Sequence, residues 1–135
     1  MKALMEAEGL PYAERSHTYN SRLAQELGSW ADTVDPSCAI HDALYRAYFV
    51  NRRNIGDRDV LLDIAESIGL KRDDAREVLD ERTFRVAVDA DWAKTRDYGV
   101  TGVPTFVAGH AGIVGARPYE SLERMLIEAG AKRRS

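Results

Sequence analysis

The fold is decided by residues 98–107, whose sequence is YGVTGVPTFV. Two glycines, Gly99 and Gly102, precede Pro104, and the β-rich run at residues 105–107 follows it. A sheet tolerates proline only at an edge or at the first residue of a strand, so we expect a strand to begin here. An X-Pro bond costs little free energy to hold cis. The bond before Pro104 is therefore a candidate for a cis peptide, with an ordinary trans turn as the alternative.

Downstream of this stretch, the sequence predicts a second strand and a final helix. The second strand is expected over residues 113–115, after the loop GHAG at residues 109–112, so that the two strands form a hairpin. Pro118 opens the last helix and Gly130 ends it. Helical spacing predicts its inward-facing residues, which are Leu122, Met125, Leu126 and Ala129.

The residues upstream of position 98 predict helices. Asp35-Pro36 is the strongest start signal, with Asp as the N-cap and Pro at the first helical position. A two-stranded sheet is marginally stable alone, so the strands must be covered by helices or extended by further strands. Apolar residues recur at helical spacing over residues 1–8, 21–33, 36–50, 57–68, 73–80 and 81–98.

Composition and charge exclude several classes of function. The 135 residues are 44% hydrophobic and 30% charged, which is enough apolar material for one globular domain with a core. A net charge of −3 leaves no basic footprint, so neither nucleic acid nor an anionic membrane surface is an expected partner. Residues 1–6 are amphipathic with an acid among them and match neither a signal peptide nor a transmembrane span, so we expect a cytoplasmic location.

The chain resembles a known family in its motifs. The sequences GVTGVPTF at residues 99–106 and GARPY at residues 115–119 resemble the C-terminal half of the DsbA family. Four earlier segments are similar, in order, to the helical insertion of FrnE-like DsbA proteins and 2-hydroxychromene-2-carboxylate isomerases: GLPY at 9–12, YNSRLA at 19–24, ALYRAYF at 43–49 and DVLLDIA at 59–65. The resemblance covers nearly all of this chain.

The resemblance implies an incomplete thioredoxin-like fold of the DsbA type, mainly α with a small β-hairpin. Residues 1–97 correspond to the helical insertion domain and a connecting helix, and residues 98–135 to the C-terminal β-β-α part. The family's first strand, its redox helix with Cys-x-x-Cys or serine, and the strand after it would all precede Met1.

For function, the resemblance implies a FrnE-like protein disulfide oxidoreductase that here lacks its redox half, so this chain alone is expected to be inactive. The substrate-binding loop is Thr101, Gly102, Val103 and Pro104. In the family, a cis proline exposes the N–H and C=O of the preceding residue, here Val103, to an extended substrate or to glutathione. The alternatives are a glutathione-dependent isomerase or transferase of the 2-hydroxychromene-2-carboxylate isomerase or kappa class, and a non-catalytic dimeric interaction module.

Cys38 and His41 are weak catalytic candidates. A single cysteine excludes an internal disulfide and a cysteine-built metal site. Cys38 is expected in the first turn of the helix opened by Asp35-Pro36, where amide dipoles favour a thiolate, and His41 shares its face. The alternative is a semi-buried thiol that packs as a small hydrophobe. The histidines lie in different segments, so no metal site is predicted.

The expected partners are a thiol-containing protein or glutathione, with no cofactor, and a second copy of the chain. The strand Thr105–Ala108 carries neither lysine nor any other charge, so its edge is open to pairing with another chain. We therefore predict a homodimer through this strand. The alternative is a monomer in which residues 1–12 fold back over that edge.

Overall fold

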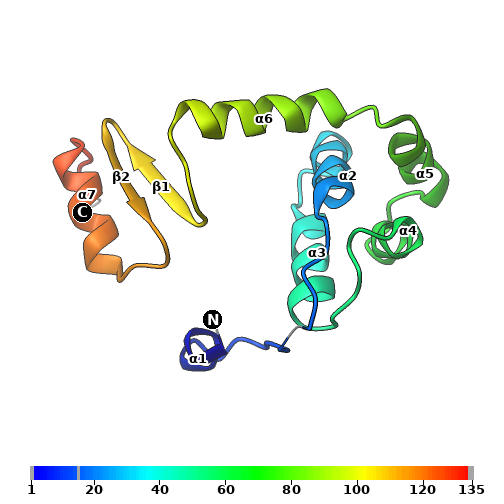
Figure 1. Cartoon of the computed structure of the whole chain (residues 1–135), viewed down its shortest axis with the longest axis horizontal. Helices are drawn as coiled ribbons and strands as arrows, with labels where there is room; N and C mark the ends of the chain where they lie inside the picture. Colours follow the sequence, from blue (N-terminus) through cyan, green and yellow to red (C-terminus); the bar gives the residue numbers. More distant parts are fainter. Residues whose placement is uncertain (1, 15, 134–135) are drawn as a thin grey trace. The chain divides into compact units, whose positions relative to one another are not determined.

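The computed structural model describes residues 2–14 and 16–133. The chain divides between Ala90 and Asp91 into two compact units (Figure 1). We call them the helical unit and the hairpin unit. The described residues are mostly helical, with one antiparallel sheet of two strands, which confirms the predicted fold class. Among them, no helix is long and apolar enough to cross a bilayer.

The helical unit is a bundle in which α2 contacts α3, α4 and α5 (Figure 1). Leu27, Leu61 and Leu62 are buried in its core. Asp57 caps α4, because its carboxylate accepts hydrogen bonds from the N–H groups of Asp59 and Val60. The helices are α1 Lys2–Ala7, α2 Arg22–Val34, α3 Ala39–Phe49, α4 Arg58–Ser67, α5 Arg72–Glu81 and α6 Arg85–Asp97.

The start of α3 differs from the prediction. The Asp35 carboxylate accepts hydrogen bonds from the N–H and the hydroxyl of Ser37, at 2.9 and 2.7 Å, and so holds a turn rather than a helix N-terminus. Cys38 then adopts the left-handed conformation, with φ at +62°. A left-handed residue cannot lie inside a right-handed helix, so α3 begins at Ala39.

A second left-handed residue separates α5 from α6. Arg82 has φ at +55° and is the C-cap of α5. The sequence predicts a helix that begins at residue 81, but α6 begins at Arg85 for this reason. Val88 of α6 is buried.

The hairpin unit contains β1 Thr105–Ala108, β2 Ala111–Val114 and α7 Tyr119–Glu128, which contacts both strands. Ala108 pairs with Ala111, so the turn consists of Gly109 and His110 alone. The predicted four-residue loop and the later start of the second strand are therefore wrong. Gly109, with φ at +60°, supplies the positive φ that such a turn needs at its first position.

The apolar face of α7 is only partly covered within the described residues. Met125 is buried, as predicted, whereas Leu126 and Ala129 are exposed. The prediction that all four apolar residues of this helix face inward is therefore wrong for these two. Ala129 lies beyond the last helical residue, Glu128, and the Leu126 side chain is 46% exposed.

Candidate functional site

The candidate site is the loop of Thr101, Gly102, Val103 and Pro104 between α6 and β1. Gly99 has φ at +66° and follows the end of α6. Its left-handed conformation lets the N–H groups of Gly99 and Val100 bond to the carbonyls of Arg96 and Thr95 in the last turn of the helix. The Val103–Pro104 peptide bond is cis. The loop is anchored at its end, where the N–H of Gly115 donates to the carbonyl of Pro104 at 2.8 Å. The Thr105 hydroxyl donates to the carbonyl of Gly102 at 2.6 Å.

Val103 is highly exposed in this loop. Its exposed fraction is 89%, although it is a large apolar residue. Among residues 2–14 and 16–133, neither its N–H nor its carbonyl has a hydrogen-bond partner. An extended chain can satisfy both groups by pairing with the backbone at this position, as in β-strand addition.

The outer edge of β1 continues this open surface. Pro104 and Gly115 form a hydrogen-bonded pair, and such pairs alternate along an antiparallel ladder. The backbone groups of Thr105 and Val107 therefore point away from β2. The Val107 side chain is 49% exposed, and no charged residue occurs in this strand.

Cys38 lies in the helical unit and is exposed, so the alternative of a semi-buried thiol is wrong. It is the N-cap residue of α3 rather than part of the first turn, as described above. The thiol makes a weak hydrogen bond to the carbonyl of Pro36, with an Sγ–O distance of 3.8 Å. The position is accessible to an external thiol or disulfide.

His41 is engaged with α2. Its Nε2 lies 2.8 Å from Asp32 Oδ1, and its ring packs on Gly28, where an added Cβ would lie 3.2 Å from Cε1. A thiol–imidazole nucleophile needs a hydrogen bond between the two groups. The described residues contain no such bond between Cys38 and His41. Cys38 and His41 therefore lie on the same segment, but no hydrogen bond connects them.

The sequence reading missed the buried carboxylate of Glu26, which has no exposed area. Arg82 donates to it through Nε and Nη2, at 2.6 and 2.7 Å, and Arg22 donates through Nε at 2.9 Å. The hydrogen bonds from Arg82 are the main cause that holds the pKa of Glu26 below its usual value, and burial opposes them. Arg22 also donates to Asp89 at 2.6 Å, so the cluster joins α2 to the start of α6.

The one sequence signal for this cluster is the i, i+4 spacing of Arg22 and Glu26. Arg82 lies 56 residues further along the chain, and its approach depends on the fold. The cluster ties helices together, and both arginines are bound to the buried carboxylate of Glu26, so we assign it a structural role. Among the described residues, no group of three or more histidine, cysteine or acidic side chains is placed to hold a metal ion.

A strand that begins at a cis proline, pairs in a hairpin and is followed by a helix that covers the hairpin is the C-terminal arrangement of a thioredoxin-like fold. The chain belongs to the DsbA family, since the model of the DSBA-like thioredoxin domain matches residues 1–126. This confirms the family that the motifs indicated.

Two relatives are similar along most of this chain. The uncharacterized protein YwbO of Bacillus subtilis is 31% identical over 118 residues, which are 87% of this chain and 58% of YwbO. The crystal structure of a probable DsbA oxidoreductase from Streptomyces coelicolor is 31% identical, with a TM-score of 0.84 over 98% of this chain and 58% of that one. The chain therefore spans 58% of the length of each.

A more distant structure shares the fold. The cytosolic disulfide reductase DsbM of Pseudomonas aeruginosa, solved with glutathione, is 19% identical, with a TM-score of 0.64 over 93% of this chain and 66% of DsbM.

Proposed function

We propose that this chain supplies the helical domain and the substrate-binding loop of a FrnE-like thiol–disulfide oxidoreductase. Membership of the DsbA-like disulfide oxidoreductase family is the basis of the proposal. The observation that carries it is Val103, an exposed residue whose backbone N–H and carbonyl are both open at the start of a strand. These groups can hold an extended peptide beside a reacting disulfide.

The role of this chain in the reaction is binding and positioning. In thiol–disulfide exchange, a thiolate attacks one sulfur of a disulfide, a mixed disulfide forms and the other sulfur leaves as a thiolate. A second thiol then resolves the mixed disulfide. The printed sequence contains Cys38 alone, so the exchange needs a thiol from outside these residues.

Titration of the isotope-labelled chain with a cysteine-free peptide tests the loop. The probe is a capped pentapeptide of alternating Val and Ser, and the readout is the amide spectrum. We expect saturable shifts at Thr101, Gly102 and Val103, because the peptide backbone pairs with Val103. The same peptide with its central amide N-methylated is the control and should bind more weakly. Absence of shifts in this loop would contradict the proposal.

Glutathione is the second ligand that we propose for this loop. The similar DsbM structure was solved with glutathione, which favours a glutathione-dependent isomerase or transferase as the alternative function. A titration with glutathione separates the two: shifts with glutathione and none with the peptide favour the alternative. A cytoplasmic location, supported by the cytosolic description of DsbM, is part of both proposals.

We also propose that the chain forms a homodimer through β1. The outward backbone groups of Thr105 and Val107, the exposed Val107 side chain and the absence of charge in the strand all support this pairing. Twofold antiparallel pairing of β1 with its copy gives a continuous four-stranded sheet and an isologous interface.

A further inference from the structure

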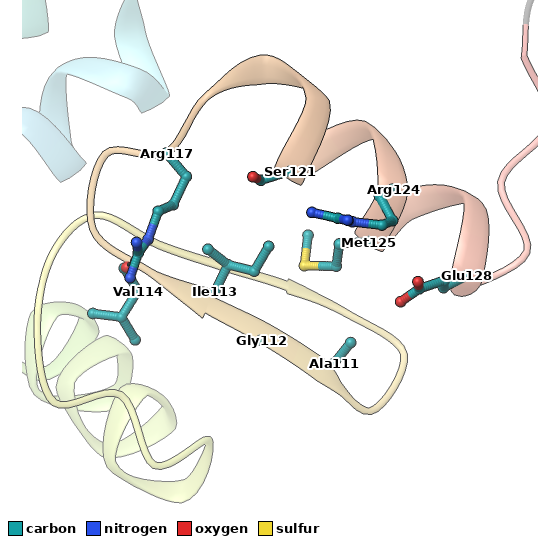
Figure 2. A pocket seen from close by; sticks show the side chains of 9 residues that line it. All are labelled: Ala111, Gly112, Ile113, Val114, Arg117, Ser121, Arg124, Met125 and Glu128. Carbon is teal, nitrogen blue, oxygen red and sulfur yellow. Dashed lines mark hydrogen bonds between the residues drawn. The ribbon is translucent and has the colours of Figure 1, made fainter.

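A groove lies between β2 and α7, within the hairpin unit (Figure 2). Its volume is about 480 Å³. Ile113 from β2 and Met125 from α7 point toward each other and form its apolar floor (Figure 2). The α7 side also presents a hydroxyl and three charged groups, from Arg117, Ser121, Arg124 and Glu128.

The β2 side of the groove is an open strand edge. The alternation that turns Thr105 and Val107 outward on β1 also turns the backbone groups of Gly112 and Val114 outward on β2. The sheet has two strands in the described part of the chain, so these groups face no third strand. Gly112 has no side chain to hinder the approach of another backbone.

The two ends of the groove carry side chains of opposite charge. Arg117 lies toward the Val114 end, where its Nε donates to the Val114 carbonyl at 3.2 Å. Arg124 reaches over the middle, and Glu128 lies toward the Ala111 end (Figure 2). Within residues 2–14 and 16–133, neither arginine has a carboxylate partner. One end of the groove is thus cationic and the other anionic.

We propose that this groove binds an extended segment of another protein that carries acidic side chains, and that the segment adds to β2 as a third strand. The side chains of Ala111 and Ile113 face α7, so a partner residue opposite either one faces the same way. An acidic side chain opposite Ile113 therefore meets the arginines. Glu128 repels an acid at the Ala111 end, so an acid opposite Ile113 is favoured over one opposite Ala111.

A small anion can contact only part of this surface. Exposed arginines hold a lone carboxylate weakly, because solvent screens the charges. The outward N–H and carbonyl of Gly112 and the apolar floor add contacts that only a peptide backbone with alternating side chains can make. The open edge of β2, the apolar floor and the two arginines together favour an extended acidic peptide.

Fluorescence anisotropy with a labelled, capped heptapeptide of alternating Glu and Val tests the charge complementarity. We expect the full chain to bind this peptide more tightly than the matched Gln and Val peptide, and added salt to weaken binding. Arg124→Gln should weaken it about fivefold, as for the loss of an exposed ion pair. Glu128→Gln should strengthen it, and Arg96→Gln, an exposed arginine of α6 outside the groove, should leave it unchanged. Equal affinity for the two peptides would overturn the proposal.

Two further measurements test the strand pairing and its location. N-methylation of alternate backbone amides of the Glu and Val peptide should abolish binding; unchanged binding would show that a side-chain anion site alone is present and would overturn the proposal. Val107→Lys, which places a charge on the β1 edge, should leave the affinity unchanged. Loss of binding in that variant would place the peptide on β1 and would also overturn it.

Discussion

At the scale of single residues, Glu26 is a charged residue buried within the helical unit. A buried carboxylate is tolerated because Arg22 and Arg82 compensate its charge at hydrogen-bond distance. Arg82 has two roles, since its left-handed backbone ends α5 and its guanidinium binds Glu26. Glycine would adopt that backbone more easily, but it could not make the ion pair.

Glu26→Gln should lower the free energy of unfolding by about 3 kcal/mol, at the lower end of the range for breaking a buried ion pair. The amide nitrogen of Gln would face guanidinium donors, and both arginines would lose their counter-charge. Urea denaturation measures the change. Glu77→Gln, an exposed glutamate on α5, is the control and should stay within about 0.5 kcal/mol of the original chain. An equal effect of both substitutions would contradict the structural role of Glu26.

The stability should also depend on pH through Glu26. Its pKa is lowered from an ordinary value of about 4.5, so the unfolded chain binds the proton first. The stabilisation is therefore fully present above about pH 5 and is lost as the pH falls through the folded-state pKa. Urea midpoints between about pH 6 and about pH 3 should fall more steeply for the original chain than for Glu26→Gln. Parallel curves would show that other carboxylates cause the acid sensitivity.

At the scale of elements, the helices were predictable where apolar spacing and a cap agree, as in α4 with Asp57. The starts of α3 and α6 were not, because they depend on the left-handed residues Cys38 and Arg82. Neither is a residue type that favours this conformation, so local sequence gives no warning. The structure around them imposes it, through the Ser37 turn and through Glu26.

In the functional-site region too, some features could be predicted from the sequence and others could not. The loop at residues 101–104 was predictable, because glycine and proline restrict the backbone locally and the motif resembles a family. The Glu26 cluster was not, because it joins residues 56 positions apart. The two-residue turn was missed because Gly112 weakens the strand signal, although glycine fits at an open strand position.

Substitution of Gly109 should destabilise the hairpin, whereas substitution of Gly112 should not. Gly109→Ala should lower stability by about 1 kcal/mol, because φ at +60° is strained for any residue with a Cβ. Gly112→Ala is the matched control and should be neutral, since the nearest atom to an added Cβ is 3.8 Å away. Amide hydrogen exchange of β1 and β2 measures the difference. Equal protection in both variants would contradict the assigned turn.

At the scale of the whole molecule, we expect no dithiol redox activity from this polypeptide alone. One cysteine cannot complete a cycle with an internal resolving thiol. The assay is oxidation of a reduced test protein in buffer without glutathione, with Cys38→Ser as the control. Turnover that persists in the Cys38→Ser chain would contradict this expectation. Turnover that needs added glutathione would be consistent with the exposed thiol of Cys38.

The oligomeric state is measured by light scattering behind size exclusion. A dimer through β1 should have twice the mass of the 15.1 kDa chain. Val107→Lys should return it to the monomer, because a lysine on the edge prevents strand pairing. Lys71→Gln, an exposed change in the helical unit, should leave the mass unchanged. A mass of 15.1 kDa that dilution does not alter would refute the dimer.

The order of the two units along the chain has a consequence for synthesis. The buried cluster of the helical unit uses residues from Ala24 to Leu79, all of which are synthesised before the hairpin. Domains fold as units in the order of their synthesis. We therefore expect the helical unit to begin folding before the hairpin unit. The open strand edges of β1 and β2 then become exposed to other chains only after the helical unit has begun to fold.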